Sequence, residues 1–199
     1  MQIVNFKEPF EIFEKWLNEA TYNRAIIEPT AMNIASVDSD NRPSSRMVLL
    51  KHFDERGFCF YTNYTSKKGQ QLKANPNICA CFYWGILGKQ IRIEGQVEEV
   101  SEQEADNYFA SRRRGSQIGA WASDQSSELN SRKELEARVK EFEQKFAGGN
   151  VPRPPHWSGF RIIPRSIEFW NDGDHRIHDR DLYQLQEDGK SWAKTLLNP

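Results

Sequence analysis

The chain has 199 residues, which is enough for one substantial core and somewhat short for two ordinary domains. Its 27 lysines and arginines against 28 acidic residues give a formal charge of −1, so no overall field draws it to nucleic acid or to anionic lipid. No apolar run approaches the roughly 18 residues of a membrane span, and Met1 to Phe10 lacks a signal-peptide pattern, so we expect a cytoplasmic protein.

The first predicted element is an amphipathic helix over about residues 9–21. Phe10, Phe13 and Leu17 recur there at helical spacing, and Pro9 suits a first-turn position. Segments rich in branched and aromatic residues follow, and each is predicted as a strand: Met32–Val37, Arg46–His52, Phe58–Thr62, Ile78–Trp84 and Gln90–Val100. Their connections have turn chemistry and are too short for helical crossovers, so the sheet should be antiparallel.

A helical insertion is predicted over about residues 101–147. The capping boxes Ser101-x-x-Glu104 and Ser131-x-x-Glu134 predict two helix starts. The segment Gln117–Ser123 between them is not an obvious amphipathic helix, and it could simply pack its Trp121. Strands are predicted again at Gly159–Ile163, Ile167–Trp170, Asp181–Gln186 and Ser191–Leu197. Because no repeat or linker divides the chain, residues 1–199 are interpreted as a single domain.

A cation stands at each end of the apolar segment from Arg46 to Lys51. On the two-residue period of a strand, these two side chains face opposite sides unless a bulge intervenes, so they could serve two different ligands. The alternative is a core strand whose ends are merely solvated.

Two further basic clusters could hold an anion. Lys67 and Lys68 lie at the start of a predicted helix, where free amide groups and ammonium groups together suit a phosphate. Arg112-Arg113-Arg114 is the densest positive charge in the chain and suggests a phosphate or carboxylate partner. In both cases the alternative is an ordinary solvated surface, and without an extended basic stripe nucleic acid is not expected.

A polar cluster follows Trp170. Strand alternation would put Arg176, His178 and Arg180 on one face, toward an anionic or electron-rich ligand. Two histidines with an aspartate could instead bind a metal, but no third ligand lies at a telling spacing. The three cysteines form no Cys-x-x-Cys pair, so we expect no metal, no disulfide framework and a reducing compartment.

Five motifs, in this order, resemble the pyridoxamine 5′-phosphate oxidase family: Ser45–Lys51, Phe60–Asn63, Ser111–Ser126, Ile167–Trp170 and His175–Arg180. The resemblance runs from about Met32 to Pro199. It implies an FMN-binding split β-barrel, mainly β and of antiparallel Greek-key type, with flanking helices and a homodimeric assembly. It also implies oxidation of pyridoxamine or pyridoxine 5′-phosphate to pyridoxal 5′-phosphate by dioxygen, with release of hydrogen peroxide and, from the amine, ammonia.

The resemblance also implies which residues make the site. The flavin contacts fall on Arg46, Met47, Val48, Leu49, Leu50, Lys51, Tyr61, Thr62, Lys67, Lys68, Gln90, Gln125, Ser126, Trp170 and Arg180. The substrate contacts fall on Lys51, Tyr108, Arg112, Ser116, Arg176 and His178, of which Arg176 and His178 are the candidate catalytic residues.

The chain departs from the family pattern in two places. Arg113 stands where the family usually has a proline, which predicts a less rigid loop. The arginine and tyrosine with which some members cover the substrate have no counterpart before the first helix. Alternatives of another class are a non-catalytic flavin- or pyridoxal-phosphate-binding protein on the same barrel and, more distantly, a structural interaction protein.

Overall fold

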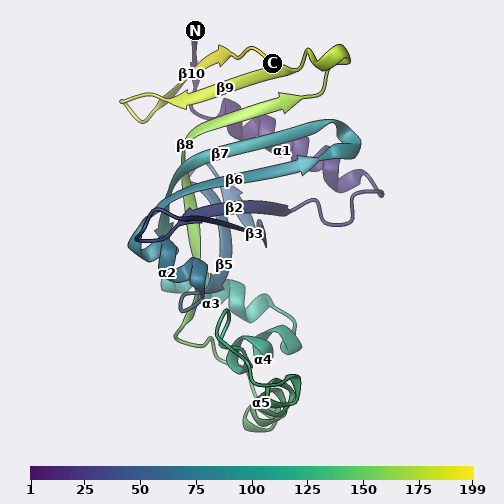
Figure 1. Cartoon of the computed structure of the whole chain (residues 1–199), viewed down its shortest axis with the longest axis vertical. Coiled ribbons are helices and arrows are strands. Elements are labelled where there is room, and N and C mark those ends of the chain that lie inside the picture. Colours follow the sequence, from purple (N-terminus) through teal and green to yellow (C-terminus); the bar gives the residue numbers. More distant parts are fainter.

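Ten strands, all paired antiparallel, form the framework of the protein in a computed structural model that describes residues 1–199 (Figure 1). The longest path through the sheet runs β1-β10-β9-β8-β7-β6-β2-β3, and β5 joins β4 to β8. The strands are β1 (Gln2–Asn5), β2 (Ala31–Val37), β3 (Pro43–Leu49), β4 (His52–Asp54), β5 (Gly57–Asn63), β6 (Asn77–Trp84), β7 (Lys89–Glu99), β8 (Trp157–Asn171), β9 (Asp179–Leu185) and β10 (Ser191–Leu196). The predicted antiparallel sheet is therefore confirmed.

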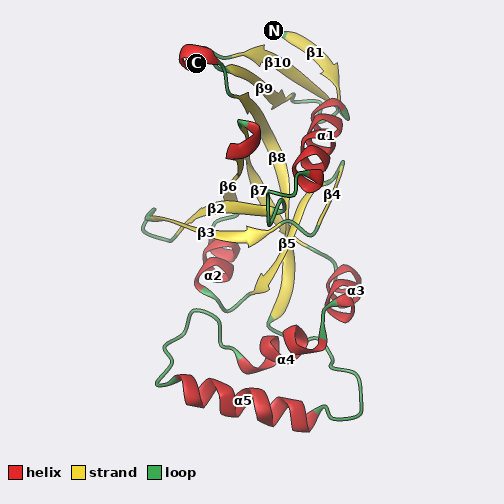
Figure 2. Ribbon diagram, turned by 90° about the vertical axis from the view of Figure 1, so that its right-hand side faces the viewer, coloured by secondary structure: helices red, strands yellow, loops and turns green.

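The helices are α1 (Glu8–Tyr22), α2 (Lys67–Ala74), α3 (Glu102–Ser111), α4 (Arg114–Ala122) and α5 (Arg132–Lys145), with short 3₁₀ turns at Gly85–Leu87 and Asp174–Arg176. In Figure 2, α1 lies alongside the sheet, whereas α4 and α5 lie together at the opposite end of the molecule. None of these helices is both long and apolar enough to cross a bilayer.

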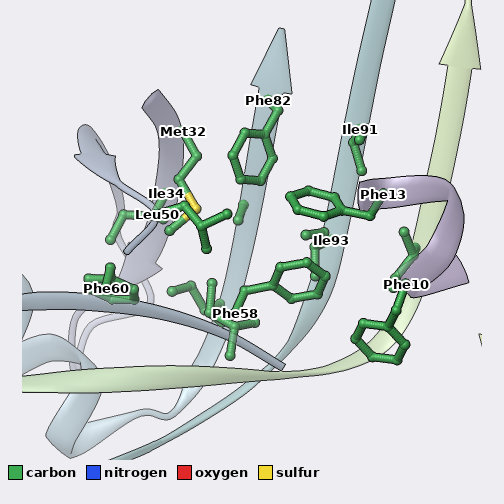
Figure 3. Packing of buried hydrophobic residues seen from close by; sticks show 14 of the residues in the cluster. Phe10, Phe13, Met32, Ile34, Leu50, Phe58, Phe60, Phe82, Ile91 and Ile93 are labelled. Carbon is green, nitrogen blue, oxygen red and sulfur yellow. The ribbon is translucent and has the colours of Figure 1, made fainter. Parts of the chain in front are cut away.

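The main core lies between α1 and the sheet. Phe13 is fully buried, and its ring centroid lies 4.8 Å from that of Phe58 and 5.2 Å from that of Phe82. Figure 3 shows Phe10 and Phe13 directed from α1 toward the apolar residues of the strands. Full burial of each such side chain contributes about 1.5–3 kcal/mol, so the predicted amphipathic helix owes its place to this face.

The strand β8 links the two parts of the sheet. Its first half pairs with β5 and its second half with β9, while β7 runs along most of its length. The register shifts between Glu94 and Gly95 of β7, and a Cβ on Gly95 would lie 2.0 Å from the Ile163 carbonyl oxygen. This bulge keeps the strand continuous across Pro164, so the prediction of two separate strands here was wrong.

The segment predicted as one strand over Arg46–His52 is also divided differently. β3 ends at Leu49 and β4 begins at His52, so Lys51 lies in the bend between them, where its amide donates to the Cys59 carbonyl. The strand is interrupted before Lys51, so the two-residue period does not extend to its side chain and does not place it opposite that of Arg46.

The helical insertion contains one helix more than the sequence predicted. The Ser101 capping box forms in full, whereas Ser131 caps its helix without the reciprocal bond from Glu134. The segment Gln117–Ser123, which is not an obvious amphipathic helix in the sequence, lies in α4 up to Ala122. Ile118 is buried there, and the Gln117 side chain donates to the Phe109 carbonyl. Contacts with α3 and α5, rather than local pattern, stabilise this short helix.

Candidate functional site

Arg46, on β3, is held by neutral oxygen atoms. Its Nη1 donates to Ser36 Oγ at 2.6 Å, and its Nη2 donates to Ser44 Oγ at 2.9 Å and to Gln71 Oε1 at 3.2 Å. Arg46 is half-buried and forms no salt bridge. Burial therefore lowers the pKa of its guanidinium, because nothing nearby neutralises the charge.

Lys68, in the first turn of α2, is a second cation without an acidic partner. Ser66 caps this helix through a bond to the Gly69 amide. The Lys68 ammonium donates to Gln125 Oε1 at 2.7 Å and to Thr62 Oγ1 at 3.1 Å. Burial, and then the charge of Arg46, lower the pKa of Lys68. Two partly desolvated cations that repel each other make a site in which a bound anion relieves both costs.

An aromatic stack with a third unpaired cation lies beside this pair. The rings of Tyr61 and Tyr108 stack with centroids 4.0 Å apart, and Trp157 lies parallel to Tyr61 at 5.4 Å. The Arg112 guanidinium lies 4.7 Å from the Trp157 centroid, its buried Nη1 has no hydrogen-bond partner, and burial lowers its pKa. This stack and the Lys68 group meet at a hollow of about 110 Å³ lined by Tyr61, Thr62, Asn63, Gly119, Ala120, Ser123, Gln125 and Trp157.

The basic run of three arginines divides into three separate roles. Arg112 lies on the aromatic stack, whereas Arg114 donates to the Gly149 and Phe146 carbonyls at the C-terminal end of α5. Arg113 is exposed at the N-terminal cap of α4, and Ser116 is exposed in the first turn of the same helix. Only Arg112 therefore remains as a partly buried, unneutralised charge.

A second group of predicted residues forms a row across three strands. Gln90 is paired with Trp170, and Trp170 with Arg180, so these side chains share one face of the sheet. Arg180 donates to the buried Glu168 at 2.8 Å, and this bond raises the pKa of Arg180. The ring of His178 lies 4.6 Å from that of Trp170, and its Nδ1 lies 3.2 Å from the Gly173 amide and 3.0 Å from Asp172 Oδ1.

The expected strand face of Arg176, His178 and Arg180 is not present, because β9 begins only at Asp179. Arg176 lies in a 3₁₀ turn in which His175 and Arg176 have positive φ, 56° and 65°. A Cβ on Gly173 would lie 2.0 Å from the Ile177 carbonyl oxygen, so this tight loop depends on glycine. Arg176 is exposed. Of Arg176 and His178, only His178 contacts the row, through the ring of Trp170.

The remaining predicted residues lie around these groups. Lys51 is exposed beside a hollow of about 220 Å³ that Leu17, Thr30 and Phe53 also line. Met47 is exposed, Val48 and Leu49 are half-buried, and Leu50 belongs to the core. Lys67 and Ser126 are exposed, Ser126 with a positive φ of 73°. Four residues of the site were not predicted from the sequence: Ser36, Ser44, Gln71 and Trp157. Of these, only Ser44 could have been found from the sequence, because it precedes Arg46 by one strand period.

Two groups thus emerge, and they lie apart within one chain. The first group lies on β3 (Arg46), on α2 (Lys68) and directly after α3 (Arg112), whereas the row runs across β7 and β8 and ends at Arg180 on β9. Figure 1 and Figure 2 both show β9 at the far end of the molecule from α3 and α4. No hydrogen bond or ion pair joins the two groups.

The sequence pattern of a known protein family, described as pyridoxamine 5′-phosphate oxidase, matches residues 19–146. The chain belongs to this family. A second such pattern, described as the pyridoxine 5′-phosphate oxidase C-terminal dimerisation region, matches residues 157–199, which include Trp170 to Arg180.

Relatives in the family match over nearly the whole chain. A pyridoxine/pyridoxamine 5′-phosphate oxidase of Myxococcus xanthus is 54% identical, covering 96% of this chain and 92% of the relative. A pyridoxine/pyridoxamine 5′-phosphate oxidase of Microcystis aeruginosa is 52% identical, covering 96% of this chain and 89% of the relative. Among solved structures, PhzG of Burkholderia lata, in complex with tetrahydrophenazine-1-carboxylic acid, has a TM-score of 0.90 at 34% identity and covers 96% and 92%. An FMN-binding protein of Nostoc punctiforme, at 16% identity and a TM-score of 0.75, shares the fold.

Proposed function

We propose that the protein is an FMN-dependent oxidase that converts pyridoxamine or pyridoxine 5′-phosphate to pyridoxal 5′-phosphate. Dioxygen is the acceptor, hydrogen peroxide is released, and the amine substrate also yields ammonia. The observation that carries this proposal is the pair of unneutralised cationic positions, one at Arg46 and Lys68 and one at Arg112. They suit two phosphate monoesters, one on the cofactor and one on the substrate, in a family whose members carry this activity in their names.

The residues of the first group fit the FMN phosphate. Arg46 and Lys68 would hold it, with Lys67 and the first amides of α2 close to the same helix start. Thr62 and Gln125, which already bond Lys68, would fix the ammonium group while it binds. The row of Gln90, Trp170 and Arg180 offers the flavin ring polar donors and an aromatic face.

The second cationic position would hold the substrate phosphate. Arg112 supplies the main charge, Tyr108 a hydroxyl and Ser116 a second hydroxyl, while Lys51 contributes an exposed ammonium group. Holding a phosphate remote from the reacting carbon converts binding energy into orientation. Arg176 and His178 are proposed to position the C4′ carbon, and the imidazole of His178 is of the type that exchanges protons near neutral pH.

Bound FMN would supply the acceptor for a hydride equivalent from C4′ and the route by which the electrons reach dioxygen. The chain's own part is to bind both phosphates, to orient the substrate ring and to exclude water from the flavin face.

We propose that each active site is shared between two subunits of a homodimer. The separation of the two groups within one chain supports this, as does the dimerisation region over residues 157–199. One subunit would supply Arg46 to Lys68, and its partner would supply Trp170 to Arg180. A twofold interface then makes two equivalent sites. We also propose a cytoplasmic location, which the three free cysteines support.

Turnover tests the proposed function. Purified protein supplied with FMN and pyridoxamine 5′-phosphate should form pyridoxal 5′-phosphate while consuming oxygen in equal amount and releasing peroxide. A protein that binds FMN and the vitamer but forms no aldehyde is instead a binding protein on the same fold. Failure to bind FMN would remove the basis of the whole proposal.

A further inference from the structure

Gln71 is a buried polar residue that is not among the residues predicted to contact the flavin or the substrate. It lies on α2 with 5% of its surface exposed. Its Oε1 accepts three hydrogen bonds, from Ser36 Oγ at 2.8 Å, from Ser44 Oγ at 2.9 Å and from Arg46 Nη2 at 3.2 Å. Both serine oxygens in turn accept from the Arg46 guanidinium. These groups form one closed network around Arg46.

The orientation of the Gln71 amide follows from this network. A guanidinium can only donate, so the atom that faces Arg46 must be the oxygen and not the nitrogen. The Nε2 atom of Gln71 is buried and has no hydrogen-bond partner. An amide that leaves its own donor unsatisfied to place its oxygen against Arg46 costs stability, which points to a role in holding that arginine.

Two other arginines of the same chain are held by carboxylates instead. Arg161 is bound by the carboxylates of Glu98 and Glu104, and Arg180 by that of Glu168. Although burial lowers it, the pKa of Arg161 is raised overall by its carboxylate partners, whereas that of Arg46 is lowered by burial alone. The three neutral oxygens fix the geometry of Arg46 as a carboxylate would, but they leave its full positive charge for a ligand.

We propose that Gln71 is the positioning residue of the flavin phosphate site: with Ser36 and Ser44 it clamps the Arg46 guanidinium without neutralising it. This inference rests on the proposed function, because it takes the anion at Arg46 to be the phosphate of FMN. Gln71 itself makes no contact with the flavin in this proposal. A carboxylate at position 71 should compete with the phosphate for Arg46 while leaving the packing unchanged.

The substitution Gln71→Glu tests this, because it replaces an amide by a carboxylate of the same shape. The neighbouring Gln70 is exposed on the same helix, so Gln70→Glu is a matched control with the same change of charge. Flavin is removed from each protein, and the dissociation constants of FMN and of riboflavin are measured by fluorescence titration at 0.15 M salt, about an 8 Å screening length.

We expect Gln71→Glu to weaken FMN binding by roughly tenfold or more, the worth of a charge-assisted contact, and to leave riboflavin binding within about twofold. The control should change both constants by less than about threefold. A general loss of structure would weaken both flavins together. If Gln71→Glu does not fold, Ser44→Asp at the half-buried edge position places a carboxylate on the same Nη2 and must lower the FMN preference in the same way.

The results separate the inference from the proposed function. If the wild type prefers FMN to riboflavin and Arg46→Met removes that preference, but the carboxylate variants retain it, the role of Gln71 is wrong and the flavin site stands. If the wild type binds both flavins equally, the phosphate site itself is wrong. A selective loss of FMN affinity in the carboxylate variants, with the control unchanged, establishes the neutral clamp.

Discussion

Replacing Arg112 by alanine should damage the use of phosphorylated substrate and leave the flavin in place. Arg112 lies over Trp157, and its buried Nη1 has no partner, so its charge is available to a ligand. It takes no part in the network that holds Arg46 and Lys68. A charge-assisted contact is worth about 1.5–3 kcal/mol, so kcat/KM for pyridoxamine 5′-phosphate should fall by roughly 10- to 150-fold.

The adjacent Arg113 provides the matched control. It is exposed and forms no salt bridge, so Arg113→Ala removes the same charge from the same loop without touching the aromatic stack. Its kcat/KM should stay within about threefold of wild type, since an exposed charge is well screened. The assay is steady-state aldehyde formation, with flavin content measured from the absorption spectrum of each protein. If Arg112→Ala lost flavin first and kept a normal KM, Arg112 would belong to the cofactor site and the assignment would be wrong.

Three further predictions concern the loop, the dimer and an ion pair. Arg113 has φ −56° and no hydrogen bond from its amide, and the residue before it has ψ 148°. Arg113→Pro should therefore fit this backbone and stabilise the fold by about 0.4–1 kcal/mol. A lower melting temperature of the variant would show that the loop is not preformed. Lys68→Ala and Arg176→Ala, each nearly inactive alone, should regain about a quarter of wild-type activity when subunits exchange at random, because one site of each mixed dimer is intact; verified exchange without recovery would place both groups in one chain. The backbone amide of Ser101, and also Arg161, hold the pKa of Glu104 at about 2. The ionised Glu104 carboxylate therefore stabilises the fold fully above about pH 4.5, and this stabilisation is lost as the pH falls toward 2. The melting-temperature difference between wild type and Glu104→Gln should shrink over that range, and a constant difference would contradict the assignment.

Elements with a strong local pattern could be predicted, and those fixed by distant partners could not. The apolar face of α1 and the capping box of α3 are local signals, and both were predicted where the structure has them. β1 was missed because it is a four-residue edge strand whose only partner is β10, at the other end of the chain. α4 was missed because its stability comes from contacts with α5 and from Trp121, whose Nε1 donates to the Pro152 carbonyl.

The same distinction applies to the site. The cationic residues Arg46, Lys68 and Arg112 were found because their motifs are recognisable in order along the chain. Gln71 was not, because its partners Ser36 and Ser44 lie 35 and 27 residues away and nothing near it in sequence marks it. The strand alternation that aligned Arg176 with Arg180 failed because two consecutive residues with positive φ wind the chain into a tight turn.

The oxidase function is tested most directly by one visible absorption spectrum of the purified protein, recorded before and after pyridoxamine 5′-phosphate is added without oxygen. We predict a yellow protein whose oxidised-flavin absorption disappears on addition of the substrate and returns when air is admitted. Flavin absorption that persists after a saturating addition of pyridoxamine 5′-phosphate, and again after pyridoxine 5′-phosphate, would contradict the function proposed for this chain.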